Sequence, residues 1–82
     1  MIIDYHEVER NGDELLIYIG IQFEDEPDSL YVVSITAGDD GTVKEWKLLY
    51  NGVDCKYTFK PEEKQALQLS LAEDDIQIHE SL

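Results

Sequence analysis

Asn-Gly dipeptides occur twice in this chain, and each lies between two runs in which apolar and polar residues alternate. Asn-Gly tolerates the positive φ angles of a two-residue turn, so each pair predicts a tight β-hairpin. The first, Asn11-Gly12, separates a short strand marked by Ile3, Tyr5 and Val8 from a longer one between Leu15 and Phe23. The first sixty residues are therefore expected to form an antiparallel sheet.

Three further strands are expected after the second one. Leu30 to Ala37 combines β-branched and aromatic residues, which favour a strand, and the acidic stretch from Glu24 to Asp28 is expected to be the loop before it. Val43 to Tyr50 predicts a fourth strand. Alternation from Val53 to Phe59 predicts a fifth strand that places the Cys55 thiol on its apolar, buried face.

A single helix is expected from about Pro61 to Glu73, because proline suits the first helical turn and the acids after it favour the positive end of the helix dipole. At about 100° per residue, Leu67 and Leu71 share one side of this helix and Leu69 points to the other. One face can thus cover the sheet. The tail, residues 74–82, is expected either to contain a short edge strand within residues 76–79 or to be irregular.

The expected fold class is α+β, with the whole chain, residues 1–82, as one domain. A five-stranded antiparallel β-meander over about residues 2–59 is followed by one C-terminal helix packed on one face, and a short sixth edge strand is one alternative for the tail. A chain of 82 residues has room for one hydrophobic core, and its 43% apolar content argues against disorder.

The charge balance restricts the partners of the chain. Nineteen Asp and Glu face six Lys and Arg, which gives a formal net charge of −13. Nucleic acid and anionic membrane surfaces would repel such a chain, so we expect neither as a direct partner and expect a basic protein surface instead. No apolar run approaches the ~18 residues of a membrane span, and one cysteine cannot form an internal disulfide, so a cytoplasmic location is expected.

No residue pattern predicts catalysis, a metal site or a cofactor. Cys55 is the sole thiol, and neither His6 nor His79 has a second His or Cys at zinc-ligand spacing. Asp39-Asp40-Gly41 lacks the alternating oxygen ligands and closing glutamate of a calcium loop. We therefore expect a binding protein, not an enzyme, with no catalytic residue, metal or cofactor.

Acidic side chains gather in clusters at expected loops and helix ends, away from the expected strands. At the helix C-terminus they oppose the dipole, which indicates either a functional choice or a helix that ends one turn earlier. The candidate partner-binding residues are these acids and the outward-pointing leucine: Glu24, Asp25, Glu26, Asp28, Asp39, Asp40, Glu62, Glu63, Leu69, Glu73, Asp74 and Asp75.

These clusters favour a nucleic-acid mimic that inhibits a DNA- or RNA-binding enzyme. In size and charge, though in no motif, the chain is similar to phage-encoded inhibitors of uracil-DNA glycosylase, restriction enzymes and CRISPR effectors. The alternative is a small phage or prophage structural protein that self-associates, as a homodimer or larger assembly, through sheet edges or Leu69. An adaptor or regulator of no named type also fits.

The helix supports a third hypothesis. The run from Ala66 to Glu73 resembles the ubiquitin-interacting motif, a solitary helix with an Ala, a Ser four residues later and acids at both ends. That resemblance implies that Ala66 and Ser70 seat the helix on ubiquitin, with Leu69 beside them. The family usually has a large apolar residue three positions before the Ala, where this chain has Glu63.

Overall fold

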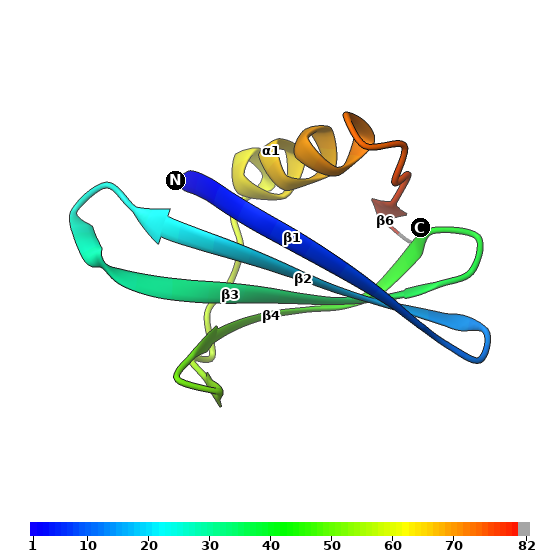
Figure 1. The fold of residues 1–82 in the computed structure, drawn as a ribbon, viewed down its shortest axis with the longest axis horizontal. Helices are drawn as coiled ribbons and strands as arrows, with labels where there is room; N and C mark the ends of the chain where they lie inside the picture. Colours follow the sequence, from blue (N-terminus) through cyan, green and yellow to red (C-terminus); the bar gives the residue numbers. More distant parts are fainter. Residues whose placement is uncertain (81–82) are drawn as a thin grey trace.

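The computed structural model describes residues 1–80, which form one sheet and one helix (Figure 1). Strands β1 to β5 are neighbours in chain order and pair antiparallel, so the expected meander with a C-terminal helix is confirmed. Residues 81–82, part of the predicted tail, lie outside the described residues. The elements are β1 (Ile2–Asn11), β2 (Glu14–Phe23), β3 (Glu26–Gly38), β4 (Thr42–Tyr50), β5 (Val53–Asp54), α1 (Pro61–Ala72) and β6 (His79–Glu80).

The two Asn-Gly pairs form different turns. Asn51 and Gly52 both have positive φ, 51° and 80°, as a type I′ hairpin requires. In the first hairpin Asn11 pairs with Glu14, so the turn residues are Gly12 and Asp13, and only Gly12 has positive φ, as in a type II′ turn. This register places Val8 opposite Ile17 and Ile3 opposite Ile21, so these apolar residues of the two strands share one face.

The acidic loop between β2 and β3 is shorter than expected. Only residues 24–25 turn, because Phe23 already pairs with Glu26 across an irregular ladder. Glu26 and Asp28 therefore lie on β3. Strand β1 also carries exposed acids, Glu7 and Glu9, so the expectation that acidity avoids the strands is wrong for these two strands.

The fifth strand is also shorter than expected. Its ladder ends at Asp54 because Lys56 has a φ of 55° and donates its backbone N–H to the Asp54 carboxylate at 2.8 Å. Cys55 still donates its N–H to the Leu48 carbonyl of β4 at 2.8 Å, and residues 56–60 continue as a connection outside the sheet. Cys55 is consequently exposed, and the prediction of a buried thiol is wrong.

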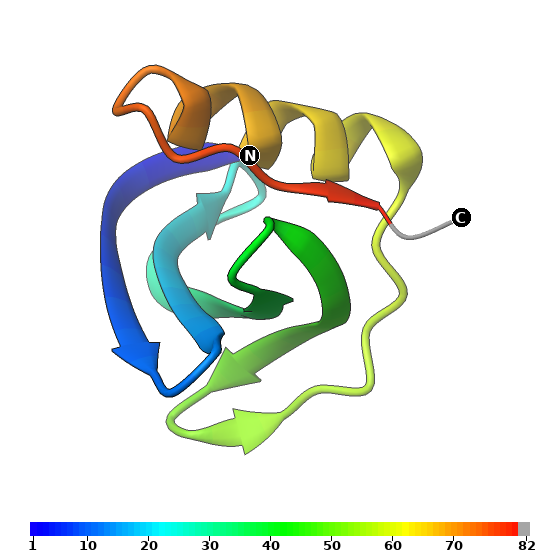
Figure 2. The same cartoon turned by 90° about the vertical axis from the view of Figure 1, so that its right-hand side faces the viewer.

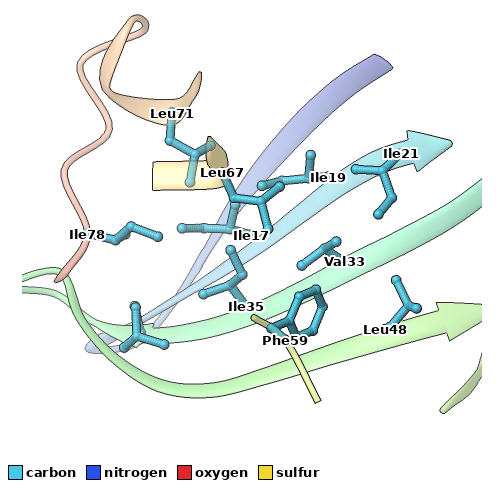
Figure 3. Packing of buried hydrophobic residues seen from close by; sticks show 12 residues of the cluster. Ile17, Ile19, Ile21, Val33, Ile35, Leu48, Phe59, Leu67, Leu71 and Ile78 are labelled. Carbon is cyan, nitrogen blue, oxygen red and sulfur yellow. The ribbon is translucent and has the colours of Figure 1, made fainter. Parts of the chain in front are cut away.

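The core lies between the sheet and α1. Ile17, Ile19 and Ile35 are fully buried on one face of the sheet, and Leu67 and Leu71 of α1 are fully buried against them (Figure 3). The sheet is strongly curled, and α1 together with the chain leading to β6 closes its open side (Figure 2). The expected helix is confirmed to within one residue, and so is its buried side.

The tail forms a strand, later in the chain than expected. β6 pairs parallel with the start of β4, with His79 opposite Thr42, while Ile78 is buried in the core. The close approach depends on Gly41, whose φ is 88°, because a Cβ there would collide with the carbonyl of Gln77. The N–H of His79 then donates to the Gly41 carbonyl at 2.9 Å.

Within residues 1–80, α1 is too short and too polar to cross a membrane.

Candidate partner-binding surface

The first acidic cluster surrounds the β2–β3 turn. Glu24, Asp25, Glu26 and Asp28 are all exposed, and Glu24 lies 3.6 Å from the N-terminal ammonium group. Glu26 accepts a hydrogen bond of 2.6 Å from the Tyr31 hydroxyl. This bond to a carboxylate favours the neutral phenol and raises the pKa of Tyr31 to about 12.

The second cluster, Asp39 and Asp40, lies on the β3–β4 turn. Consecutive turns of a meander lie at opposite ends of the sheet, so this cluster is remote from the first one (Figure 1). Asp40 accepts a hydrogen bond of 3.0 Å from the backbone N–H of Thr42, which lowers the pKa of its carboxyl. Both carboxylates are exposed.

The two acids at the N-terminus of α1 have different roles. Glu62 is exposed, whereas Glu63 accepts the Lys60 backbone N–H at 2.8 Å and the Tyr57 hydroxyl at 2.7 Å. Glu63 thereby stabilises the first helical turn and ties residues 55–60 to it. The hydrogen bond from the Tyr57 hydroxyl to the Glu63 carboxylate raises the pKa of Tyr57 to about 12.

The acids at the C-terminus of α1 lie on a closing turn. Ile76 donates its N–H to the Leu71 carbonyl and Asp75 donates to the Ala72 carbonyl, which is the Schellman pattern. Asp75 has the left-handed φ, 63°, that this motif requires. The helix therefore ends within this cluster: Glu73 is its C-cap and still donates its N–H to the Leu69 carbonyl at 3.2 Å, whereas Asp74 and Asp75 lie on the closing turn.

Asp74 and Leu69 differ in their surroundings. Asp74 lies 3.2 Å from the Nε2 atom of His6 on β1, which joins the helix end to the edge of the sheet. Leu69 is 61% exposed, on the side of α1 that faces away from the core, as its spacing from Leu67 and Leu71 predicts.

Lysine side chains do not neutralise these clusters. Lys44 pairs with Glu14, Lys47 with Glu45, Lys56 with Asp54 and Lys64 with Glu80, at 2.9 to 3.8 Å. All four acids lie outside the clusters. Across residues 1–80, no lysine or arginine lies within ion-pair distance of a candidate acid.

The clusters are distributed along the molecule and do not converge on one patch. The two turns mark opposite ends of the sheet, and α1 lies beside the sheet between them with one acidic cluster at each of its ends (Figures 1 and 2). The longest axis measures 35 Å, against 24 and 23 Å for the others. The structure thus brings Glu24 close in space to Asp25 and Glu26, but not to the acids of the other turn.

A cavity of about 340 Å³ opens beside the first cluster, and the sequence did not predict it. Its lining combines aromatic rings, an apolar floor, a thiol and two carboxylates: Phe23, Tyr31, Tyr57, Leu48, Cys55, Asp25 and Glu26. The available signal was the position of Phe23 directly before three acids, which places an aromatic side chain and carboxylates at the same strand end.

In the part of the chain that the structure describes, no three His, Cys, Asp or Glu side chains are arranged to hold a metal ion. Comparisons with protein-family models, with curated proteins and with solved structures return no match for this chain.

Proposed function

We propose that this protein is a non-enzymatic acidic binding protein whose exposed carboxylate clusters engage a basic protein surface. The observation that supports it most is the pairing of the lysines. Four of the five lysines pair with acids outside the clusters. In residues 1–80, Glu24 meets the N-terminal ammonium and Asp74 meets the His6 ring, and the remaining cluster acids keep their charge for a partner. Exposed charges of this kind accelerate association and select partners of opposite sign.

The proposed partner is a nucleic-acid-binding enzyme, which the protein inhibits by occupying its phosphate-binding surface. Dividing the 35 Å axis by the net charge of −13 gives about one charge per 2.7 Å. That spacing lies between the ~1.7 Å of duplex DNA and the ~3.4 Å of one strand. The placement of clusters at both turns and both helix ends spreads this charge along the long axis.

The test is competitive capture. The protein is immobilised, a bacterial lysate is passed over it at low salt, and retained proteins are eluted either with rising salt or with duplex DNA. We expect a nucleic-acid enzyme that both treatments release and whose activity the free protein inhibits. Retained proteins that salt releases but DNA does not would contradict mimicry, and so would binding without inhibition.

The exposed side of α1 supports a second candidate function, an assembly or adaptor role. Leu69 is 61% exposed, and Ala66, one turn before Ser70, is exposed beside it. This side is open to a second copy of the chain or to ubiquitin, as the resemblance to the ubiquitin-interacting motif implies. Sedimentation of wild type and Leu69→Ala over a range of concentrations, with and without ubiquitin, separates the two. A monomer that does not bind ubiquitin would exclude both.

A further inference from the structure

The aromatic rings of the cavity beside the β2–β3 turn are inclined to one another. The Phe23 ring lies 5.2 Å from the Tyr31 ring at an interplanar angle of 72°, and 6.0 Å from the Tyr57 ring at 50°. Leu48, which is only 3% exposed, adds an apolar surface. Rings of different orientation therefore bound one cavity, and the electron-rich face of an aromatic ring attracts cations.

The polar groups of this cavity are almost all acceptors. The Tyr31 hydroxyl donates to Glu26 and the Tyr57 hydroxyl donates to Glu63, so both hydroxyl protons are already engaged. Asp25 and Glu26 contribute carboxylates, and no Lys or Arg in residues 1–80 lies within ion-pair distance of either. The lining thus offers negative charge and aromatic rings, and its thiol, Cys55, already donates to the Val53 carbonyl at 3.8 Å.

A second groove, lined in part by Phe59 and Lys64, has a different character. It measures about 440 Å³ and lies beside α1, where Lys64 and Glu80 both line it and pair with each other at 3.3 Å. Its charges are satisfied internally. Of these two sites, the aromatic cavity is the one that combines carboxylates outside any Lys or Arg ion pair with several rings.

We propose that the cavity formed by Phe23, Tyr31, Tyr57, Leu48, Cys55, Asp25 and Glu26 binds an alkylammonium group. A methylated ammonium fits best, because it is weakly hydrated and its transfer from water to an aromatic wall costs little free energy. The carboxylates balance its positive charge. The volume lies in the range of small-ligand pockets. The cavity shares Asp25 and Glu26 with the first acidic cluster but lies at the other end of the sheet from the cluster of the β3–β4 turn. Binding of a small alkylammonium ion does not require that the protein also mimics nucleic acid, so the two proposals can fail separately.

The test compares choline with 3,3-dimethylbutan-1-ol, which has the same shape without the charge. At fixed ionic strength, NMR titration follows the ring signals of Phe23, Tyr31 and Tyr57. We expect choline to shift these signals and to bind at least about fivefold more tightly than the neutral alcohol, as a cation–π contribution of about 1 kcal/mol requires. Choline is also expected to slow the alkylation of Cys55 by iodoacetamide.

Two double variants with the same change in net charge separate the cavity from the general field of the protein. Asp25→Asn with Glu26→Gln is expected to weaken choline binding about tenfold, whereas Asp39→Asn with Asp40→Asn, at the other end of the sheet, is expected to change it less than twofold. Phe23→Leu, with folding checked by Trp46 fluorescence, is expected to weaken binding about fivefold. Equal weakening by the two double variants would overturn the proposal, as would equal binding of choline and the alcohol or unchanged ring signals.

The source of the alkylammonium group follows from a second titration with peptides that carry lysine or trimethyllysine. Tighter binding of a peptide than of choline assigns the cavity to a lysine side chain of a partner protein. Tighter binding of choline assigns it to a free amine.

Discussion

Tyr31 and Tyr57 both donate their hydroxyl protons to glutamates, and this raises the pKa of each to about 12. The folded protein therefore holds these protons more tightly than the unfolded chain, whose tyrosines ionise near pH 10. Stability from these bonds is fully present below about pH 10 and is lost as the pH rises toward 12. Absorbance of tyrosinate during an alkaline titration is expected to reveal two late-ionising residues.

The matched variants for this prediction are Glu26→Gln and Glu63→Gln. The first is expected to lower the pKa of Tyr31 alone and the second that of Tyr57 alone. Ionisation of all five tyrosines in one step near pH 10 would contradict the two bonds.

Asp75 lowers the stability of the fold, because a residue with a side chain occupies the left-handed position that glycine usually takes after a helix. Asp75→Gly also removes a negative charge from the negative end of the dipole. It is expected to raise the free energy of unfolding by about 0.5–1 kcal/mol, measured by urea denaturation with Trp46 as the fluorescent probe. Asp74→Gly, at a residue without positive φ, is the control and is expected to lower stability.

Individual residues mark the limit of prediction from the sequence. Helical spacing predicted which side of α1 is buried: Leu67 and Leu71 are buried and Leu69 is not. The exposure of Cys55 was not predictable from the sequence. It depends on the positive φ of Lys56, and lysine does not indicate that conformation. The aromatic cavity was missed for a similar reason, since it forms where the fifth strand fails to continue.

At the scale of elements, α1 holds the fold together through one side only. Leu67→Ala is expected to lower the free energy of unfolding by about 2–5 kcal/mol, because it leaves a cavity in the core. Leu69→Ala is expected to change it by less than about 0.5 kcal/mol. Urea denaturation of both variants checks this difference, and similar losses would mean that Leu69 is covered.

The strands and the helix were predictable, but the pairing of β6 was not. Alternation and turn residues predict the meander because each hairpin is local in the sequence. β6 has only two residues, and its position depends on contacts far apart in the chain: Ile78 in the core and the close approach of Gln77 to Gly41. No periodic pattern encodes contacts of that kind.

At the scale of the whole molecule, the central claim is that the location of the charge matters, and not only its sum. β1 and the turn that follows it offer a matched control, because the acids there are exposed, as are most of those of the clusters. Two variants each lose four negative charges. The cluster variant carries Asp39→Asn, Glu62→Gln, Glu73→Gln and Asp75→Asn, and the control carries Asp4→Asn, Glu7→Gln, Glu9→Gln and Asp13→Asn.

The most direct measurement is the affinity of wild type and these two variants for the captured enzyme as a function of salt concentration. The cluster variant is expected to bind about tenfold or more weakly at low salt and to lose much of its salt dependence, since four contacts worth about 0.4 kcal/mol each are removed. The control is expected to stay within about threefold of wild type. Equal weakening of the two variants would contradict the claim, because the partner would then respond to net charge alone.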